Sequence, residues 1–321
     1  MATAVIRFDL RRAPFSTVME AEQYAQCLEM ARWADEHGFA GVAISEHHGV
    51  DFASAPTALA GLLLGATRRA HVTVNALLVP LHDPIRLAEA VATLDVTSGG
   101  RFTFVAGLAY RHEEFEMAGV DRTQRGALFE EYVQVLRRAW SGEPFEWRGR
   151  TIVVTPTPTS APEQLMWLGG SVRRSAERAA RLRFPFFTMS VDPELGDIYR
   201  DECAEVGYDT GFFVAPSGPL FLHVAEDPER AWEEIAPYAV YDVVSYNSWQ
   251  TGDHDNVAAS AATTADELLA SGMWKVVTPE ECIELARASG SVVLHPLMGG
   301  MPPELGWSSL RLVVDKVLPA L

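Results

Sequence analysis

Cysteine is scarce in this chain of 321 residues: there are three, Cys27, Cys203 and Cys282, far apart in the sequence. No two of them have the spacing of a zinc site or a redox motif, and an odd number of scattered cysteines indicates no disulfide framework. Such cysteine usage is typical of proteins in a reducing compartment, so we expect a cytoplasmic protein.

Positive charge and long apolar runs are also scarce. The chain has 26 lysines and arginines against 43 aspartates and glutamates, a net charge of −17, which argues against nucleic acid as a partner. Its longest apolar stretch, residues 58–66, is too short to cross a bilayer, and the first residues lack the pattern of a signal peptide. We expect no membrane anchor, and we expect a few arginines to hold any anionic ligand locally.

A glycine-rich dinucleotide-binding motif is absent after the first apolar run, where residues 10–14 read Leu-Arg-Arg-Ala-Pro. Apolar runs with the length of buried strands alternate with amphipathic segments along most of the chain. We predict strands at residues 4–10, 41–44, 72–79, 102–106, 166–168, 184–189, 220–224 and 292–294. We predict helices at residues 21–37, 56–67, 85–96, 125–140, 171–182, 194–206, 228–239 and 305–318. Asp83 and Pro84 predict the N-cap and the first residue of the third helix.

Eight strands that alternate with eight helices form the pattern of a (β/α)8 TIM barrel, and we predict one α/β domain over residues 1–321. A doubly wound open sheet is the alternative. Two insertions interrupt the alternation: residues 142–157, after the fourth helix, predict a small β-hairpin, and residues 238–275, after the seventh strand, form a longer insertion. Tyr246, Trp249 and Trp274 are either a lid over the barrel mouth or plain packing.

Two histidines and a carboxylate follow directly after the second predicted strand, in Ile44-Ser45-Glu46-His47-His48-Gly49. The functional face of a barrel is built at the carboxyl ends of its strands, and imidazole is suited to proton transfer near neutral pH. Adjacent residues of an extended chain point in opposite directions, so we expect one histidine to face the pocket while the other packs behind it. A structural rim is one alternative. A metal site that includes His223 and His295 is another, although the sequence shows no usual ligand spacing.

Gly169-Gly170-Ser171 follows a predicted strand and opens a helix. Glycines let a ligand approach the backbone, Ser171 is a suitable N-cap, and the free N–H groups of a helix start bind anions. Arg173 and Arg174 lie in the first turn of this helix and Arg125 starts another, although cations at these positions are unfavourable for the helix dipole. With Arg111 as a further candidate, these residues predict a phosphate site.

Several segments, taken in their order along the chain, resemble the bacterial luciferase-like monooxygenase family. They are Glu46-His47-His48, residues 76–89, Leu94-Asp95 with residues 98–102, Glu114-Phe115 with residues 119–121, Arg125 before Glu130-Glu131, and residues 140–143, 167–171 and 278–281. The similarity runs over nearly the whole chain and is densest through residues 30–182. It implies a TIM barrel that binds reduced FMN or, as in many relatives, the deazaflavin coenzyme F-420.

The resemblance also implies roles for particular residues. It implies that His47 moves a proton beside the flavin and that Glu46 is the carboxylate that orients it. Asn75 and Ala76 fall where the family has a non-prolyl cis peptide, in a bulge behind the flavin ring. Arg125 and Ser171 match positions that contact the cofactor phosphate in the family. Together with residues at the strand ends and the helix start, the cofactor-binding residues that we expect are Asn75, Ala76, Gly107, Tyr110, Arg125, Gly169, Gly170, Ser171 and Arg174.

Three positions depart from the luciferases. Val105-Ala106 stands where luciferase has a reactive cysteine, Gly107 where it has a phosphate-binding arginine, and Gly169-Gly170 where it has a turn that contains glutamate. The Gly-Gly-Ser form is common among relatives that use F-420, so light emission is not implied.

We therefore expect a flavin-dependent oxidoreductase, a monooxygenase that uses reduced FMN and O2 on a small organic substrate. The alternatives are an F-420-dependent enzyme that transfers a hydride, a non-catalytic flavin-binding subunit, and a metal-dependent barrel hydrolase that uses His47, His48, His223 and His295. The resemblance further implies a homodimer that receives reduced flavin from a separate reductase. From charge, apolar run length and ligand spacing we expect neither nucleic acid nor a membrane as partner, and no bound metal.

Overall fold

The computed structural model describes residues 2–249 and 262–321. In this described part, ten strands form one sheet, and every pair of neighbouring strands that hydrogen-bonds in it is parallel. The strands are β1 (Thr3–Phe8), β2 (Gly41–Ile44), β3 (His71–Leu78), β4 (Phe102–Gly107), β7 (Met166–Gly169), β8 (Phe186–Phe187), β9 (Phe213–Val214), β10 (Phe221–Val224), β11 (Trp274–Val277) and β12 (Ser291–Leu294). They include all eight strands predicted from the sequence, and β9 and β11 are additional.

The order of the strands is that of a barrel. The first strand, β1, pairs with β2 on one side and with the last strand, β12, on the other. The order then runs through β2, β3, β4, β7, β8 and β9 without reversing, whereas a doubly wound sheet reverses at a switch point. Among the described residues the ladder ends at β9 and β11, and residues 215–220 carry the chain from β9 to β10. The predicted α/β barrel architecture is confirmed.

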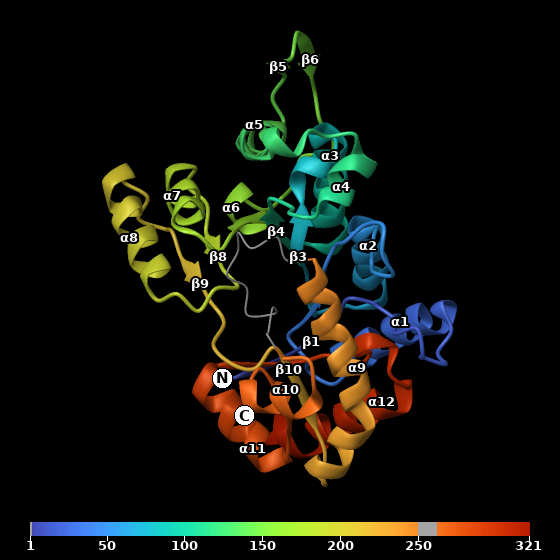
Figure 1. The fold of residues 1–321 in the computed structure, drawn as a ribbon. Coiled ribbons are helices and arrows are strands. Elements are labelled where there is room, and N and C mark those ends of the chain that lie inside the picture. Colours follow the sequence, from blue (N-terminus) through green and yellow to red (C-terminus); the bar gives the residue numbers. More distant parts are fainter. Residues whose placement is uncertain (1, 250–261) are drawn as a thin grey trace.

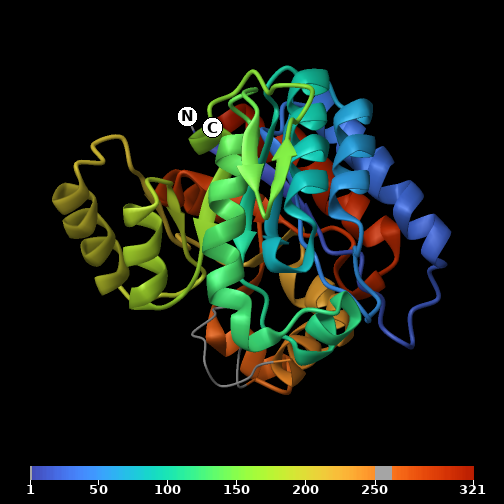
Figure 2. The same cartoon turned by 90° about the horizontal axis from the view of Figure 1, so that it is seen from above.

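Helices cover the outside of the sheet, as Figures 1 and 2 show. They are α1 (Glu20–Glu36), α2 (Pro56–Ala66), α3 (Pro84–Ser98), α4 (His112–Ala118), α5 (Arg125–Ala139), α6 (Pro162–Leu165), α7 (Arg173–Arg181), α8 (Glu194–Val206), α9 (Pro228–Ser248), α10 (Ala265–Ser271), α11 (Pro279–Ser289) and α12 (Pro303–Leu312). Short 3₁₀ or π segments lie at Val79–Leu81, Arg122–Gln124, Met298–Gly300, Val313–Val317 and Leu318–Ala320. All eight predicted helices are present, and α4, α6, α10 and α11 are additional. Neighbouring helices α1, α2, α3 and α5 stand side by side, and α7 packs against α8.

The main hydrophobic core lies between the sheet and these helices. In β1, alternate residues Ala4, Ile6 and Phe8 point outward into this core and are completely buried. Full burial of side chains such as Ile6 and Phe8 contributes about 1.5–3 kcal/mol each to folding. The intervening residues Val5 and Arg7 point to the inside of the barrel, where both line a cavity.

Helix α3 shows how the sequence fixes a helix against the sheet. The Asp83 side chain accepts hydrogen bonds from the N–H groups of Ile85 and Arg86, so the predicted N-cap is confirmed. Gly99 ends the helix in the left-handed conformation, with φ 69°. Val91 lies on the buried face of the helix between these two ends.

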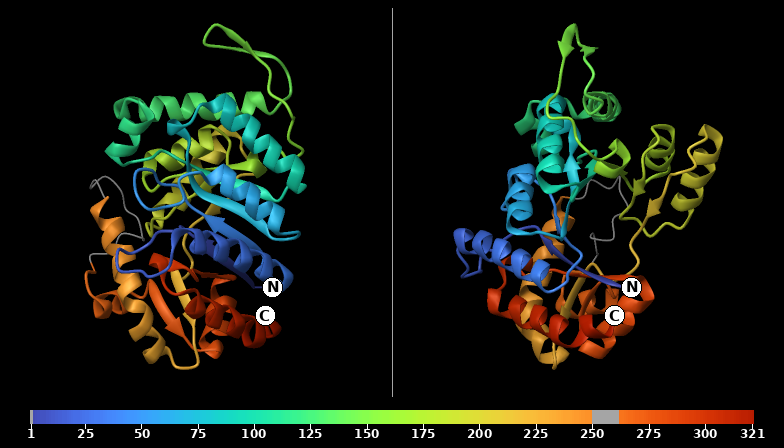
Figure 3. Two further views of the ribbon diagram at one scale, coloured as in Figure 1. Left: turned by 90° about the vertical axis from the view of Figure 1, so that its right-hand side faces the viewer. Right: turned by 180° about the vertical axis from the view of Figure 1, so that it is seen from behind.

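The predicted hairpin after the fourth predicted helix is confirmed as β5 (Phe145–Trp147) and β6 (Arg150–Ile152), an antiparallel pair that stands away from the barrel (Figures 1 and 3). The second insertion differs from expectation. Its first part continues α9 to Ser248, beyond the predicted end at residue 239, because Val243 and Tyr246 of the extra turns are buried. Residues 250–261, which include His254, lie outside the described residues.

None of the described helices combines the length and the apolar character needed to cross a membrane.

Candidate active site

A cavity of ≈ 390 Å³ opens at the carboxyl ends of β2 and β3 and continues down the inside of the barrel. Its mouth is formed by side chains that the sequence predicted, namely Glu46, His47, Asn75, Ala76 and Tyr110. Apart from Arg7 of β1, its inner part is lined by small and apolar residues of β1, β2, β10 and β12, and residues 214–220 close one side. The predicted functional face therefore coincides with a real cavity.

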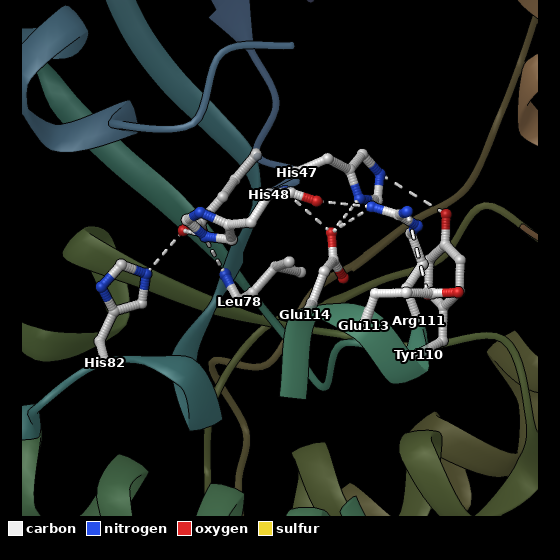
Figure 4. A network of polar contacts seen from close by, with 9 residues as sticks. His47, His48, Leu78, His82, Tyr110, Arg111, Glu113 and Glu114 are labelled. Atoms are coloured by element: carbon white, nitrogen blue, oxygen red, sulfur yellow. Dashed lines mark hydrogen bonds and ion pairs between the residues drawn. The ribbon is translucent and has the colours of Figure 1, made fainter. Parts of the chain in front are cut away.

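His47 is held at the mouth of this cavity by a carboxylate. Its Nδ1 lies 2.8 Å from Glu114 Oε1, and its Nε2 lies 3.5 Å from the hydroxyl of Tyr110 (Figure 4). Glu114 lies in α4, and the same oxygen accepts the backbone N–H of His48 at 3.0 Å. Burial lowers the pKa of His47 and outweighs the opposing effect of Glu114, so a neutral imidazole is favoured. When Nδ1–H donates to Glu114, Nε2 is left as the proton acceptor.

Glu46 does not orient His47, and this expectation from the sequence is wrong. Its Oε1 instead accepts hydrogen bonds from His48 Nε2 at 2.8 Å and His82 Nε2 at 2.7 Å, and its Oε2 accepts the Leu78 N–H at 2.6 Å. Figure 4 shows His48 and His82 together on one side, and His47 with Glu114 on the other. Burial opposes ionisation of Glu46, but the hydrogen bonds from His48 and His82 outweigh it and lower its pKa to about 2. The same bond raises the pKa of His48.

The four histidines of the hydrolase alternative do not converge on a shared metal-binding point. His47 faces Glu114, His48 faces Glu46, and His295 Nε2 lies 3.5 Å from Asp9. Three side chains in residues 2–249 and 262–321 are close enough to share a metal ion: Glu46, His48 and His82. Their possible ligand atoms lie within 4.8 Å of one another, and no other group of His, Cys, Asp and Glu in these residues does so. These three already satisfy one another by hydrogen bonds.

The peptide bond between Asn75 and Ala76 is cis, as the family resemblance implied, and the pairing of β3 with β4 shifts register there. Gly107 of β4 explains how the bulge packs. A Cβ added at Gly107 would lie 2.8 Å from Ala76 Cβ, closer than real Cβ atoms approach, and 3.3 Å from Leu78 Cδ2, which is a tight contact. The glycine therefore lets Ala76 lie against β4.

Replacement of Gly107 by Ala is expected to push the bulge into the cavity and to lower the free energy of unfolding by about 1–3 kcal/mol, as overpacking does. The second change Ala76→Gly removes the clashing atom, so the double variant should recover most of the loss. Thermal unfolding of the two single variants and the double variant measures this coupling. If the loss of unfolding free energy in the double variant equals the sum of the losses in the two single variants, the packing argument is contradicted.

Of the predicted phosphate residues, Arg125 starts α5, Arg173 and Arg174 lie in the first turn of α7, and only Arg174 lines the hollow between these helices. This hollow of ≈ 570 Å³ is lined by Thr123, Gly126, Ala127, Glu130, Arg174, Glu177, Arg178 and Arg181. Helix α7 has Val172 and not Ser171 as its N-cap, and no side chain caps it, so the predicted capping role of Ser171 is wrong. The Ser175 N–H donates to the Val172 carbonyl, so the N–H groups of Arg173 and Arg174 are the ones at this helix start that can bind an anion.

The arginines near this hollow differ in what they contact. Arg178 and Arg181 both bind Glu130, at 2.9 Å and 3.0 Å, and Arg173 pairs with Glu177 at 3.4 Å. Arg174 is exposed and pairs with no carboxylate of the described residues. Arg125 Nη1 donates to the carbonyl of Arg122 at 3.1 Å.

Arg111 lies beside His47 and Glu114, and not at the hollow between α5 and α7. It donates to the His48 carbonyl at 2.7 Å and lies 3.4 Å from Glu114 Oε1. Its guanidinium stacks on the Trp249 ring at 4.8 Å. Arg111 thus steadies the carboxylate that holds His47.

Aromatic rings pack around His47, and two of them, Tyr246 and Trp249, belong to the group that the sequence left as either a lid or plain packing. The Phe52 and Trp249 rings have centroids 4.8 Å and 4.9 Å from the His47 ring, and the Tyr246 ring is 6.1 Å away. Trp274 is not among these rings, because it is buried in a separate apolar cluster around α9, α10 and β11. In these surroundings the His47 side chain is buried, with 5% of the residue exposed.

Three functional neighbours were missed in the sequence. Glu114 was noted only within a family motif, and its pairing with His47 joins residues 67 positions apart. Arg11 is buried against Asp9 and Asp242, both at 3.2 Å, and lies under Trp249. Arg7 lines the cavity itself. The sequence signal that could have revealed it is a single charged residue in a strand of mostly apolar residues.

Residues 6–292 match the sequence profile of the family described as luciferase-like monooxygenase. The chain belongs to this family. A family relative from Escherichia coli K12, named luciferase-like monooxygenase, is 31% identical over 179 residues, which cover 54% of this chain and 52% of the relative. The oxygenase component of a flavin-dependent trigonelline monooxygenase from Acinetobacter baylyi is 25% identical over 171 residues, 50% of this chain and 47% of the relative. The match thus spans about half the length of these curated relatives.

Solved structures share the fold over nearly the full chain. A monooxygenase from Streptomyces bottropensis has a TM-score of 0.80 at 22% identity and 99% coverage of both chains. The oxygenating constituent of 3,6-diketocamphane monooxygenase from Pseudomonas putida, in complex with FMN, has a TM-score of 0.70 at 16% identity, covering 100% and 98%. An F-420-dependent secondary alcohol dehydrogenase with an F-420–acetone adduct has a TM-score of 0.68 at 18% identity, covering 100% and 99%. Both cofactors therefore occur on this fold.

Proposed function

We propose that this protein is a flavin-dependent oxidoreductase, a monooxygenase that uses reduced FMN and O2 to oxidise a small organic substrate. The observation that carries the proposal is His47. It lies at the mouth of a deep cavity, with one ring nitrogen bound to Glu114 and the other facing Tyr110. Membership of the luciferase-like family supports the same chemistry.

The residues at the mouth fit a flat aromatic cofactor. The backbone of Asn75–Ala76 forms one wall of the cavity, and the remaining lining is mostly apolar, as ring-binding pockets are. A bound reduced flavin would supply the electrons for activating O2. Asn75, Ala76 and Tyr110 would hold its ring system beside His47.

The start of α7 fits the phosphate of the cofactor. The uncapped N–H groups and the Ser171 hydroxyl offer donors, Arg174 adds a positive charge that no described carboxylate neutralises, and Arg125 starts the neighbouring helix. A Cβ at Gly170 would lie 2.2 Å from Ser175 Oγ, so this glycine allows the turn to pack on α7. We propose that Gly169 and Gly170 shape this turn.

The protein groups around His47 can hold and move one proton. Glu114 fixes Nδ1–H and would stabilise the imidazolium that forms when Nε2 accepts a proton. Tyr110 stands at Nε2, and burial raises the pKa of its phenol, so it stays protonated and acts as a donor. The rings of Phe52, Tyr246 and Trp249 exclude water from this exchange.

The experiment that tests the proposal is anaerobic titration of the purified protein with reduced FMN and, separately, with reduced coenzyme F-420. We expect saturable binding of reduced FMN and rapid oxidation of the complex by O2. If the protein binds reduced F-420 but not reduced FMN, the monooxygenase proposal is replaced by hydride transfer. If it binds neither cofactor, the proposal is wrong.

Arg174→Met is expected to weaken the binding of reduced FMN about tenfold, because one charge-assisted hydrogen bond to phosphate is lost. Arg173→Met is the matched control, since Arg173 neighbours it but pairs with Glu177. Riboflavin, which lacks the phosphate, should bind both variants and the wild type alike. If Arg174→Met loses as much affinity for riboflavin as for FMN, Arg174 does not contact the phosphate.

We further propose a homodimer and a separate reductase that supplies reduced flavin. The name of the Acinetobacter baylyi relative as an oxygenase component supports the reductase. Large apolar side chains exposed on neighbouring helices, Leu62 of α2 and Val96 of α3, support a second copy as the covering partner. If sedimentation equilibrium gives the molar mass of one chain, the dimer is excluded.

A further inference from the structure

Arg7 places a positive charge inside the barrel. It lies on β1 with its Cα opposite Ala43 of β2, and Ala43 is in turn opposite Thr73 of β3. Ser45 and Asn75, which line the mouth, lie two residues further along these strands. Because a strand rises about 3.3 Å per residue, the Arg7 backbone lies about 7 Å below the mouth.

The surroundings of Arg7 leave space beside its guanidinium. Barrel interiors are normally filled by bulky branched side chains, but here Arg7, Ala43 and Ser45 line an open cavity. The deeper lining is apolar and includes Val5, Leu222 and Val293. Arg7 is the one arginine or lysine among the described residues that line this cavity.

No described carboxylate neutralises Arg7 directly. Its one hydrogen bond to a described residue goes from Nη2 to the Tyr246 hydroxyl at 3.3 Å, and no described carboxylate oxygen lies within 4.0 Å. The nearby Asp9 and Asp242 are both bound to Arg11, each at 3.2 Å.

The charge on Arg7 is nevertheless permanent. Burial works to lower its pKa, but the electrostatic influence of Tyr246, Asp9 and Asp242 outweighs burial and raises it. A guanidinium with donors left over, in a cavity with apolar walls, is matched by a planar anion that accepts two parallel hydrogen bonds.

We propose that Arg7 binds the carboxylate of an organic acid and that this acid is the substrate. Tyr246 links the two ends of the site, since its hydroxyl contacts Arg7 and its ring lies 6.1 Å from the ring of His47. About one aromatic ring therefore separates Arg7 from His47, and the apolar walls of the cavity suit an acid with an aromatic or alicyclic ring. The identity of this acid as substrate rests on the proposed function, whereas its binding does not.

Calorimetry on the protein without any flavin tests the binding. The probes are benzoate and cyclohexanecarboxylate, each compared with its neutral primary amide. We expect the wild type to bind the acids at least ten times more tightly than the amides, and Arg7→Met to lose about 10- to 100-fold for the acids alone. Arg86→Met is the control, because Arg86 is exposed and pairs with Glu89 on the surface. Ala43→Leu keeps the charge but fills the space, and should weaken acids and amides alike.

Two further variants guard against misfolding of Arg7→Met. Arg7→Lys keeps the charge and should retain part of the affinity for the acids, and Tyr246→Phe frees Arg7 and should leave that affinity unchanged or increased. No saturable binding of acids by the wild type, or equal binding of acids and amides, would overturn the proposal. A loss of reduced FMN affinity in Arg7→Lys with unchanged acid binding would also overturn it, because Arg7 would then contact the cofactor. Failure of flavin to bind the wild type leaves the acid-binding result readable on its own.

Discussion

Replacement of His47 by Ala is expected to lower the rate of product formation by about 10²–10⁴-fold, the usual contribution of a positioned acid or base. The affinity for reduced FMN should stay within a few fold of the wild type, since the mutation removes one side chain at the mouth. In the wild type, kcat/KM should fall on the acid side, at pH values below 6.5, because burial lowers the pKa of His47 and the neutral form is the proton acceptor. Rates measured across pH for wild type and variant check both statements.

Matched variants separate proton transfer from structure. Glu114→Gln keeps the shape but removes the charge that stabilises the imidazolium, so it should reduce the rate less than His47→Ala and extend the acid limb to lower pH. His48→Ala changes the neighbouring histidine, which bonds Glu46 outside this relay, and should preserve the pH profile. Unchanged turnover in His47→Ala would favour the non-catalytic flavin-binding subunit instead.

The barrel was predictable because its strands and helices carry local patterns. Residues 41–44 and 194–206 fold with the predicted bounds, since an apolar run and an amphipathic repeat need no distant partner to be recognised. The strand β9 has two residues, too few for such a pattern, and was not predicted. Of the strand predicted at residues 184–189, the structure forms only Phe186–Phe187 as β8. The length of α9 was missed for another reason, because its last turns are buried by contacts distant in sequence.

The site was predictable in position but not in pairing. A histidine after a strand end points to the barrel mouth wherever the fold is known, and His47 is there. Its partner Glu114 comes from α4, and no local rule connects two residues so far apart. The alternation of an extended chain does explain the error at Glu46: residues two apart share a face, so Glu46 bonds His48 and points away from His47.

Glu46→Gln is expected to lower the free energy of unfolding at pH 7 by about 3 kcal/mol. Hydrogen bonds from His48 and His82 overcome the cost of burial and lower the pKa of Glu46 from 4.5 to about 2, and each pKa unit corresponds to about 1.4 kcal/mol. A carboxyl with a lowered pKa in the folded state stabilises the protein above pH 4.5, and this stabilisation is lost as the pH falls from 4.5 towards 2. The difference between wild type and variant should therefore shrink across that window.

Urea unfolding at several pH values measures this difference, and Glu113→Gln is the control. Glu113 is exposed, and its ion pair with Arg111 is 3.9 Å long, so its loss should change stability by less than about 1 kcal/mol at any pH. A constant difference between wild type and Glu46→Gln from pH 7 to pH 3 would show that lost packing, and not the buried charge, causes the destabilisation. A difference near zero at pH 7 would mean that Glu46 gains as little from His48 and His82 as a surface pair does. Because the Leu78 N–H is bound by the same carboxylate, the charge of Glu46 also anchors the end of the β3 bulge that walls the cavity.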